Sequence, residues 1–445
     1  MIGIVMFFVA LFMLVIGFPV AFTFGAVAIF FGFGASIIEV MPDGSFVDMY
    51  EEFISMFSMM PFRIWSIMTN KILMAIPLFI FMGIILQKSQ LAERLLESMG
   101  VLFGKIRGGL AVSTMLVGAL LAASTGVVGA SVVAMGVIAL PIMLKHNYSK
   151  ELSTGTICAA GTLGQIIPPS IVLIILADVF GQSVGDLFHA ALWPALFLVF
   201  MYIMYILIAS YMKKELAPAL ALENNFSYNH QIRKAIFAII PPLILIIVVL
   251  GSIFGGIATP TESAAVGAVG SIILAALYKK LSLTLIQEAA LESVKITAMV
   301  FAILIGATAF SMVFTYSGAD MIVEEFMLNL PGEKWGFIIL SMLAIMILGF
   351  FIDFIEISYI IVPILIPISQ TIGIDPIWFA ILIAMNLQSS FLTPPFGFSL
   401  FYLKGVAKDS VQTTQIYKGV IPFILIQLFV LALLIIFPEF FGLGS

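Results

Sequence analysis

The sequence predicts an all-α polytopic membrane protein built from an inverted-topology repeat, with two re-entrant hairpins and two broken helices. Three observations predict this fold. Hydrophobic residues make up 62% of the 445 residues and charged residues only 10%, whereas soluble domains carry roughly 25% charge. Landmarks of the first half recur in the second half at one constant spacing. Two proline pairs interrupt segments that are otherwise as apolar as membrane helices.

The apolar blocks leave room for a dozen or more membrane-embedded segments at about 20 residues per span. They lie near 2–38, 72–87, 109–144, 152–180, 187–212, 235–254, 257–278, 296–314, 336–374, 376–403 and 419–438. The first block has no basic region and no clear cleavage site, so we interpret it as a retained span. Segment 46–71 mixes apolar with charged side chains, which favours interfacial helices or a scaffold arm. The polar stretch 213–234 resembles a hinge between halves.

Composition and motifs argue against several other classes of protein. No basic run indicates nucleic-acid binding, and Cys158 is the only cysteine. The string nearest to a Walker A motif, at 100–106, has the wrong spacing, and HExxH does not occur. We therefore expect neither an ATP-driven pump nor an enzyme. A non-transporting scaffold subunit remains an alternative.

The repeat is defined by an offset of 226 residues. This offset carries Pro168-Pro169 onto Pro394-Pro395, and Leu140-Pro141-Ile142 onto Ile366-Pro367-Ile368. A weaker likeness relates the surroundings of Pro19 to those of Pro260. Internal repeats of this kind are typical of secondary transporters.

The first hairpin is predicted in block 112–144, which holds 33 residues and no charge. Two full spans need about 40 residues plus a turn, and small residues gather at its middle, in 122–131. The alternative is one long tilted helix. Basic residues flank the block, namely Lys105, Arg107, Lys145 and Lys150. The positive-inside rule therefore places its flanks in the cytoplasm.

The second hairpin is predicted in block 335–374. Glu333, Lys334 and Asp375 flank it without a positive excess, and Trp335 and Trp378 stand at that edge as interface anchors. Its flanks should face outside, so the equivalent hairpins enter from opposite faces. Two ordinary short spans joined by a solvated turn are the alternative.

The broken helices are predicted to unwind over 161–170 and 386–396. Pro168, Pro394 and Pro395 mark these breaks, because proline removes a backbone donor and clashes inside a helix. Unwound backbone at membrane depth can coordinate a cation through freed carbonyls, while half-helix N-termini face an anion. We expect the first stretch to face the hairpin tip at 124–126 and the second to face the tip at 349–358.

The offset pairs positions in the two stretches. Gly164 and Ile167 correspond to Ser390 and Thr393, and Ala123 corresponds to Gly349. Carbonyls and hydroxyls suit a hard monovalent cation such as Na⁺, so two symmetry-related cation sites follow as a hypothesis. Ordinary helix–helix contact between small residues is the alternative for each hydroxyl.

Four charges lie within apolar blocks. Asp353 and Glu356, at the second tip, are candidates to ligate a cation or carry a proton, because ionisable groups inside a membrane indicate function. Glu262 follows Pro260-Thr261 and is expected to cap a helix. Asp178 is expected near an interface.

The four arginines lie outside the predicted hairpins and broken helices. A carboxylate substrate would then be held by helix N-termini at Ser131 and Ser170, by hydroxyls and by bound cations. Such an arrangement makes cation and substrate binding interdependent, as coupling requires.

Three segments carry a family resemblance, namely GASVVAMGVIALPIM (129–143), 161–188 and GGIATPTESAAVGAV (255–269). They resemble the large membrane subunit of tripartite ATP-independent periplasmic (TRAP) transporters, the DctM-type permeases, and the likeness covers essentially the whole chain. It implies a fold like that of sodium-coupled dicarboxylate transporters, in which a mobile domain moves like an elevator against a scaffold.

The resemblance also implies a cofactor, partners and a location. Na⁺ drives uptake of an organic acid, such as sialic acid or a C4-dicarboxylate, across a bacterial inner membrane. A periplasmic substrate-binding protein delivers the solute, and a small four-span membrane subunit packs on the scaffold. Because nothing precedes the first span here, we expect that subunit to be a separate chain. A stand-alone carrier or antiporter without a binding protein is the alternative.

The complete prediction assigns residues and domains. The first sodium site comprises Thr125, Gly164, Ile167 and Pro169, and the second comprises Gly349, Ser390, Thr393 and Phe396. Substrate is expected at Ser124, Gly126, Ser131 and Ser170, with Asp353 and Glu356 in coupling. The scaffold is expected at 1–111, 187–335 and 409–445, and the mobile domain at 112–186 and 336–408. The sequence does not identify the solute.

Overall fold

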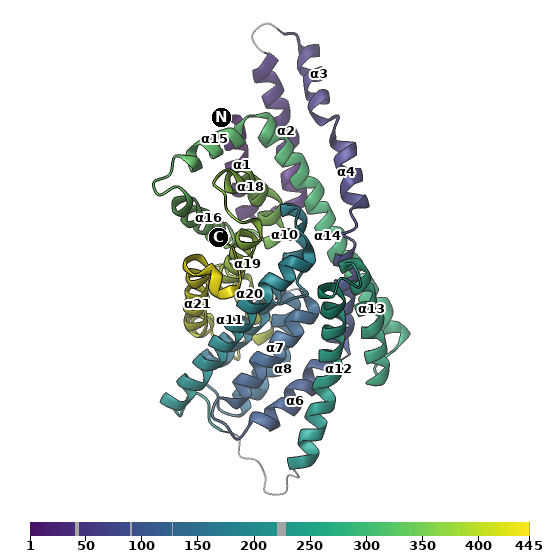
Figure 1. Ribbon diagram of the computed structural model, residues 1–445, viewed down its shortest axis with the longest axis vertical. Coiled ribbons are helices and arrows are strands. Elements are labelled where there is room, and N and C mark those ends of the chain that lie inside the picture. The colour runs from purple at the N-terminus through teal and green to yellow at the C-terminus, as the bar shows by residue number, and fades with distance from the viewer. Residues whose placement is uncertain (41–43, 90, 127, 220–227, 445) are drawn as a thin grey trace.

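The computed structural model describes residues 1–40, 44–89, 91–126, 128–219 and 228–444, without the side chains at 91, 92, 97, 101, 124, 125 and 228–235. The described residues form helices and no strand. Eight of these helices are long and apolar enough to cross a membrane, and shorter apolar helices accompany them. The molecule is elongated, with α3 near one end and the start of α12 near the other (Figure 1).

The helices follow one another along the whole chain. They are α1 (Ile2–Ile16), α2 (Val20–Val40), α3 (Phe46–Phe57), α4 (Met60–Thr69), α5 (Ala75–Lys88), α6 (Leu91–Phe103), α7 (Gly109–Thr125), α8 (Val128–Lys145), α9 (Lys150–Thr162), η1 (Leu163–Gln165), α10 (Ile171–Phe180), α11 (Val184–Met212), α12 (Tyr228–Phe254), α13 (Pro260–Leu277), α14 (Leu283–Tyr316), α15 (Ala319–Leu328), α16 (Lys334–Leu348), α17 (Phe354–Glu356), η2 (Ile357–Ile361), α18 (Val362–Thr371), α19 (Pro376–Leu392), α20 (Phe398–Ala407), α21 (Thr413–Ile436) and η3 (Pro438–Phe441).

Both predicted hairpins are present. In the first, α7 ends at Gly126, whose φ of 61° lies in the left-handed region that glycine adopts without a Cβ penalty. The chain then returns as α8. In the second, α16 ends before Gly349, and the returning arm begins at Phe354 and runs through the π-helical turn η2 into α18. Figure 1 shows α7 and α8 in the lower part of the molecule and α16 and α18 in the upper part.

Both broken helices are present as well, but they unwind over shorter stretches than predicted. The first runs as α9 and η1, loses helical structure over 166–170, and resumes as α10. The second stays helical to Leu392 and unwinds only over 393–397. Ser389 and Ser390 are still helical, and their hydroxyls donate to carbonyls of the preceding turn, at Met385 and Leu387.

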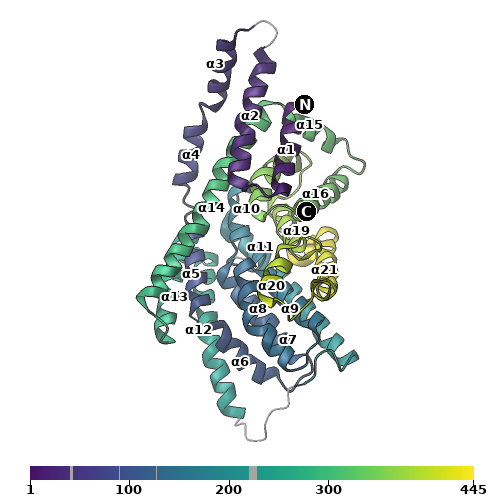
Figure 2. The same ribbon diagram turned by 180° about the vertical axis from the view of Figure 1, so that it is seen from behind.

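The two repeats exchange contacts. The second arm of the first hairpin, α8, packs on α20 of the second repeat, and α18 packs on α10 of the first (Figures 1 and 2). Likewise α9 contacts α21, and α19 contacts α11. Where α19 contacts α9, Gln388 Nε2 lies 3.5 Å from Thr162 Oγ1. These two residues are separated by the repeat offset of 226 residues, so equivalent positions meet each other.

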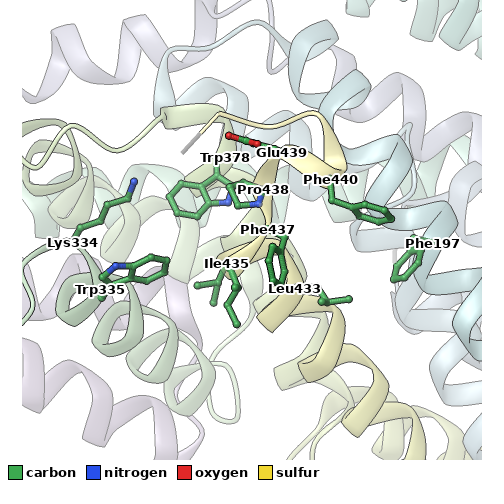
Figure 3. Close-up of a pocket in the computed structure, with 11 residues that line it drawn as sticks. Phe197, Lys334, Trp335, Trp378, Leu433, Ile435, Phe437, Pro438, Glu439 and Phe440 are labelled. Atoms are coloured by element: carbon green, nitrogen blue, oxygen red, sulfur yellow. The ribbon is translucent and has the colours of Figure 1, made fainter.

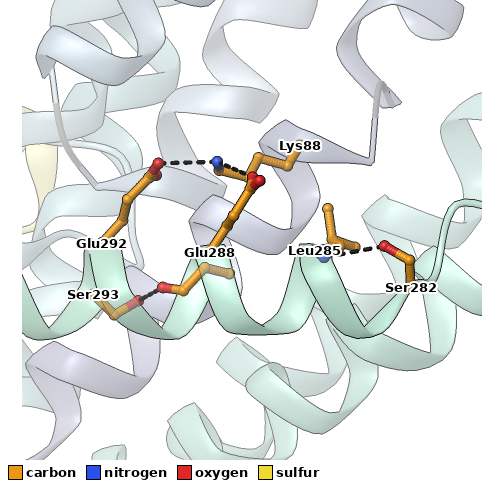
Figure 4. A network of polar contacts seen from close by, with 7 residues as sticks. Lys88, Ser282, Leu285, Glu288, Glu292 and Ser293 are labelled. Carbon is orange, nitrogen blue, oxygen red and sulfur yellow. Dashed lines mark hydrogen bonds and ion pairs between the residues drawn. The ribbon is translucent and has the colours of Figure 1, made fainter.

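The remaining helices pack around these elements, with α2 and α5 against α14 and α13 against α5. Lys88, in the last turn of α5, lies 2.8 and 2.9 Å from carboxylate oxygens of Glu288 and Glu292 on α14 (Figure 4). The segment predicted as interfacial forms α3 and α4, which pack on α2 and α14. Their 12 and 10 residues are too few to cross about 30 Å of hydrocarbon.

Hydrogen bonds define the surroundings of two of the charged residues that lie in apolar blocks. Glu262 completes a capping box with Thr259 at the start of α13, where its Oε2 accepts from the Thr259 N–H at 2.8 Å. The expected capping role is therefore confirmed. Asp178 accepts from Asn70 Nδ2 at 2.6 Å, which links the end of α10 to the segment after α4.

The first apolar block is divided at Gly17 into α1 and α2.

Candidate functional site

The candidate site lies where each hairpin tip meets a broken-helix loop. In the first half, Gly164 faces the last turn of α7, because a Cβ added there would lie 2.9 Å from the Ala122 carbonyl oxygen. Gly126, at the tip, faces the start of α10, because its added Cβ would lie 3.1 Å from the Ile171 side chain. The expected encounter between tip and loop is therefore present in the first half.

Serine hydroxyls replace the backbone donors that the prolines remove. In a continuous helix the N–H at position 169 would bond the carbonyl of Gln165, and the N–H at 395 would bond that of Phe391. The structure supplies Ser170 Oγ to the Gln165 carbonyl at 2.7 Å and Ser399 Oγ to the Phe391 carbonyl at 2.8 Å. Positions 165 and 391 are equivalent in the repeat, so in both halves a serine hydroxyl donates to the carbonyl that a proline leaves without its helical donor.

The first loop is almost fully enclosed. Pro168, Pro169 and Ser170 are buried, whereas Ile167 is half-buried. Ser170 is also the N-cap of α10, accepting from Leu173 N at 3.4 Å. The side chains of Thr125 and Ser124 lie outside the described residues, although their backbone ends α7 beside this loop. Of the predicted first sodium site, Gly164 lies in η1, and Ile167 and Pro169 lie in the loop that follows η1.

The second loop makes a tighter contact with its tip. A Cβ on Gly349 would overlap the hydroxyl of Ser390. Thr393, which ends α19, donates its hydroxyl to the Ser389 carbonyl at 2.7 Å and keeps its oxygen lone pairs. The ring of Phe396 lies 5.2 Å from that of Phe351 in the tip. All four predicted residues of the second sodium site therefore lie at one junction of tip and loop.

The two loops differ in exposure. Phe396 is 45% exposed and Pro395 is also exposed, whereas the repeat-equivalent Ser170 and Pro169 are buried. The sequence offset treats the halves as equal, and only the three-dimensional packing distinguishes them. One junction is covered by protein in this structure, and the other opens to its surroundings.

The two acidic residues of the second tip have different environments. Asp353 is half-buried and caps the returning arm, with Oδ1 accepting from Phe354 N at 2.7 Å. Glu356 is not in the loop but in the first turn of the helix, where it is 2% exposed. Within the described part of the chain, no hydrogen-bond partner is found for Glu356 Oε2, nor for the buried hydroxyls of Ser358 and Tyr359. Glu356 directly precedes the π-helical turn η2, and Ser358 and Tyr359 lie within it. Such turns are frequent at functional sites.

Two further residues at the site were not predicted from the sequence, namely Gln165 and Tyr402. The carboxamide of Gln165 is fully buried, and neither of its polar atoms has a partner among the described residues. A glutamine inside an apolar run was the available signal. Tyr402 on α20 covers the first turn of α8, because a Cβ on Gly129 would lie 2.9 Å from its ring. Ser131, predicted for substrate, is buried in the same turn of α8.

The donor atoms at both junctions are carbonyl and hydroxyl oxygens. The residues that the structure describes contain no group of three or more His, Cys, Asp or Glu side chains able to hold a metal ion. Oxygen donors of this type suit hard cations, whereas nitrogen and thiolate donors suit transition metals. Each junction also places a helix N-terminus, that of α10 or α20, beside the loop, where backbone N–H groups favour anions.

Comparison with known proteins gives one consistent family. The sequence model of the family described as the tripartite ATP-independent periplasmic transporter, DctM component, matches residues 4–440. A C4-dicarboxylate TRAP transporter large permease protein of Pseudomonas aeruginosa is 34% identical over 367 residues, covering 82% of this chain and 84% of that protein. A sialic acid TRAP transporter large permease protein of Vibrio cholerae is 28% identical over 374 residues, covering 83% and 85%.

A solved structure supports the fold independently. The YdaH transporter of Alcanivorax borkumensis, described as having an unusual topology, superposes with a TM-score of 0.66. The alignment covers 95% of this chain and 98% of that one at 14% sequence identity. At this level of identity the likeness concerns the fold alone.

Proposed function

Since the chain belongs to the tripartite ATP-independent periplasmic transporter family as a DctM component, we propose that it imports a carboxylated organic solute by coupling to Na⁺. It works in a bacterial inner membrane with a small membrane subunit and a periplasmic substrate-binding protein. The solute belongs to the C4-dicarboxylate or sialic acid class, which is supported by the C4-dicarboxylate and sialic acid permeases among its relatives.

One observation carries the coupling proposal. Gly349 in a hairpin tip lies against Ser390 in a broken helix, and the repeat-related Gly164 lies against the tip of the other hairpin. A cation held by oxygens at each junction would draw tip and loop together. Na⁺ at these two places would complete the anion site between the helix N-termini, so that solute binds well only when the cations are present.

The mechanism follows from the division into hairpins and surrounding helices. The mobile unit, residues 112–186 and 336–408, carries both junctions, and it moves as one body against the scaffold residues 1–111, 187–335 and 409–445. Closing a junction around Na⁺ and solute would remove its polar backbone from exposed surroundings, which lowers the cost of crossing the membrane core. The exchanged contacts between α8 and α20 and between α10 and α18 support movement of the two halves together.

Uptake into proteoliposomes tests this function. Vesicles containing the chain and its small membrane subunit are given an inward Na⁺ gradient and labelled succinate or sialic acid, with and without the soluble binding protein. Uptake that requires both Na⁺ and the binding protein supports the proposal. Na⁺-driven uptake without the binding protein would favour a stand-alone carrier, and binding of ²²Na⁺ without uptake of either solute would contradict the proposed solute classes.

A further inference from the structure

A pocket of about 620 Å³ lies away from both junctions, where the starts of α16 and α19 meet α11 and the C-terminal end of α21. Figure 3 shows its lining side chains. They are Phe197, Lys334, Trp335, Trp378, Leu433, Ile435, Ile436, Phe437, Pro438, Glu439 and Phe440.

The pocket carries two opposite charges that do not neutralise each other. Lys334 Nζ lies 5.1 Å from the centroid of the Trp378 ring, and the Glu439 carboxylate lies beyond that ring (Figure 3). Neither Lys334 nor Glu439 belongs to the salt bridges found among the described residues, which join Lys88 to Glu288 and Glu292. One cation and one anion therefore line the same cavity without a salt bridge between them.

The other lining residues are apolar or aromatic, and three of the aromatic side chains are exposed. Trp335 is 48% exposed, and Phe437 and Phe440 are each 57% exposed. Aromatic side chains of this kind gather where a membrane meets water, and the buried Trp378 fixes the arrangement by donating its Nε1–H to the Leu434 carbonyl at 2.9 Å. A ligand matching this pocket has a charged end carrying both signs and an apolar end.

We propose that this pocket binds a phospholipid whose zwitterionic headgroup carries a primary ammonium, as phosphatidylethanolamine does. Lys334 binds the phosphate, and Glu439 accepts hydrogen bonds from the ammonium. The acyl chains lie on Phe437, Phe440 and Ile436. A trimethylated headgroup offers no N–H donor to Glu439, and an anionic headgroup is repelled by it, so the two charges together select the primary ammonium.

Lipid binding by the purified full chain tests this inference. Native mass spectrometry measures the affinity for phosphatidylethanolamine, phosphatidylcholine and phosphatidylglycerol with identical acyl chains. The expected result is a preference of about tenfold for phosphatidylethanolamine, the change expected when one charge-assisted hydrogen bond is lost. Lys334→Gln should weaken binding of all three lipids. Glu439→Gln should remove the preference over phosphatidylcholine and improve phosphatidylglycerol binding.

Matched variants separate the pocket from general surface charge. Glu333→Gln and Lys214→Gln change exposed residues that do not line the pocket, so both should bind the lipids as the native chain does. Equal affinity for the three lipids would overturn the proposal, as would a phosphatidylglycerol preference in the native chain. A preference that persists in both Lys334→Gln and Glu439→Gln would place the lipid elsewhere. Size-exclusion profiles confirm that each variant is folded.

Discussion

Gly349 lies so close to Ser390 that any side chain at position 349 would overlap the serine hydroxyl. In the first half the glycine belongs to the broken helix instead of the hairpin: Gly164 faces the Ala122 carbonyl of the hairpin. Both junctions therefore use one glycine for close approach, but from opposite sides. The sequence offset had paired Gly164 with Ser390 without indicating this reversal.

The first prediction concerns that approach. Gly349→Ala should separate the hairpin tip from α19 and reduce Na⁺-driven uptake at least about tenfold, because overpacking costs about 1–3 kcal/mol. Adding Ser390→Gly in the same chain should recover much of the uptake. Gly405→Ala is the control, because an added Cβ meets nothing within 4 Å there. Native uptake by Gly349→Ala would contradict the close-approach argument.

The second prediction concerns Na⁺ at the second junction. Thr393→Ala should raise the Na⁺ concentration for half-maximal uptake about tenfold, since it removes one oxygen ligand. Thr371→Ala is a matched control, because that hydroxyl also bonds the carbonyl four residues earlier, at 3.0 Å, but lies outside the tip. Equal Na⁺ dependence in both variants would remove Thr393 from the site.

The third prediction separates charge from capping at Asp353. Asp353→Asn keeps an oxygen for the Phe354 N–H and should unfold close to the native temperature, but we expect at least tenfold less uptake if the charge ligates or balances a cation. Asp353→Ala also loses the cap, which costs about 1 kcal/mol of stability. The measurements are thermal unfolding by intrinsic fluorescence and uptake in vesicles. An Asn variant that transports normally would leave Asp353 a structural cap only.

The fourth prediction concerns the hydroxyl that replaces a missing backbone donor. Ser170→Ala should destabilise the chain by about 1–3 kcal/mol, because the buried Gln165 carbonyl loses the donor shown in the structure. Ser271→Ala should cost less. That serine is equally buried but bonds the Ala268 carbonyl inside a regular helix. Chemical unfolding in detergent compares the two, and equal costs would show that the hydroxyl at 170 has no special role.

The fifth prediction concerns the contact between α5 and α14. Lys88→Met should lower stability by about 1 kcal/mol or less, because the carboxylates of Glu288 and Glu292 are about half exposed. Replacing both glutamates by glutamine should remove most of that loss, since like charges four residues apart repel. Melting temperatures in choline chloride test this without supplying Na⁺. A loss unaffected by high salt would point to packing of the lysine stem instead.

The sequence foretold much of the candidate site because its signals are local. Apolar length, small residues and proline positions gave both hairpins and both breaks, and the 226-residue offset aligned them. It overestimated the second unwound stretch, since α19 remains helical to Leu392. It also could not indicate the meeting of Thr162 with Gln388, which arises only because the two halves cross.

The proline pairs separate what the sequence determined from what the tertiary structure decided. By itself the sequence determined that the chain spans a membrane, that it repeats, and where backbone donors are missing. It contains a third pair, Pro241-Pro242, yet α12 runs through it as a helix. There the hydroxyl of Tyr278, beyond the end of α13, reaches the carbonyls of Phe237 and Ala238 at 3.2 and 3.4 Å.

Those carbonyls are the ones whose helical donors Pro241 and Pro242 remove. At the two broken helices the replacement donors come instead from Ser170 and Ser399, in the half-helices that follow the loops. Tertiary structure therefore decided which proline pairs unwind and which remain helical. The physical reason is that a freed carbonyl in an apolar setting must find a donor, and the position of that donor in space is set by packing rather than by the local sequence.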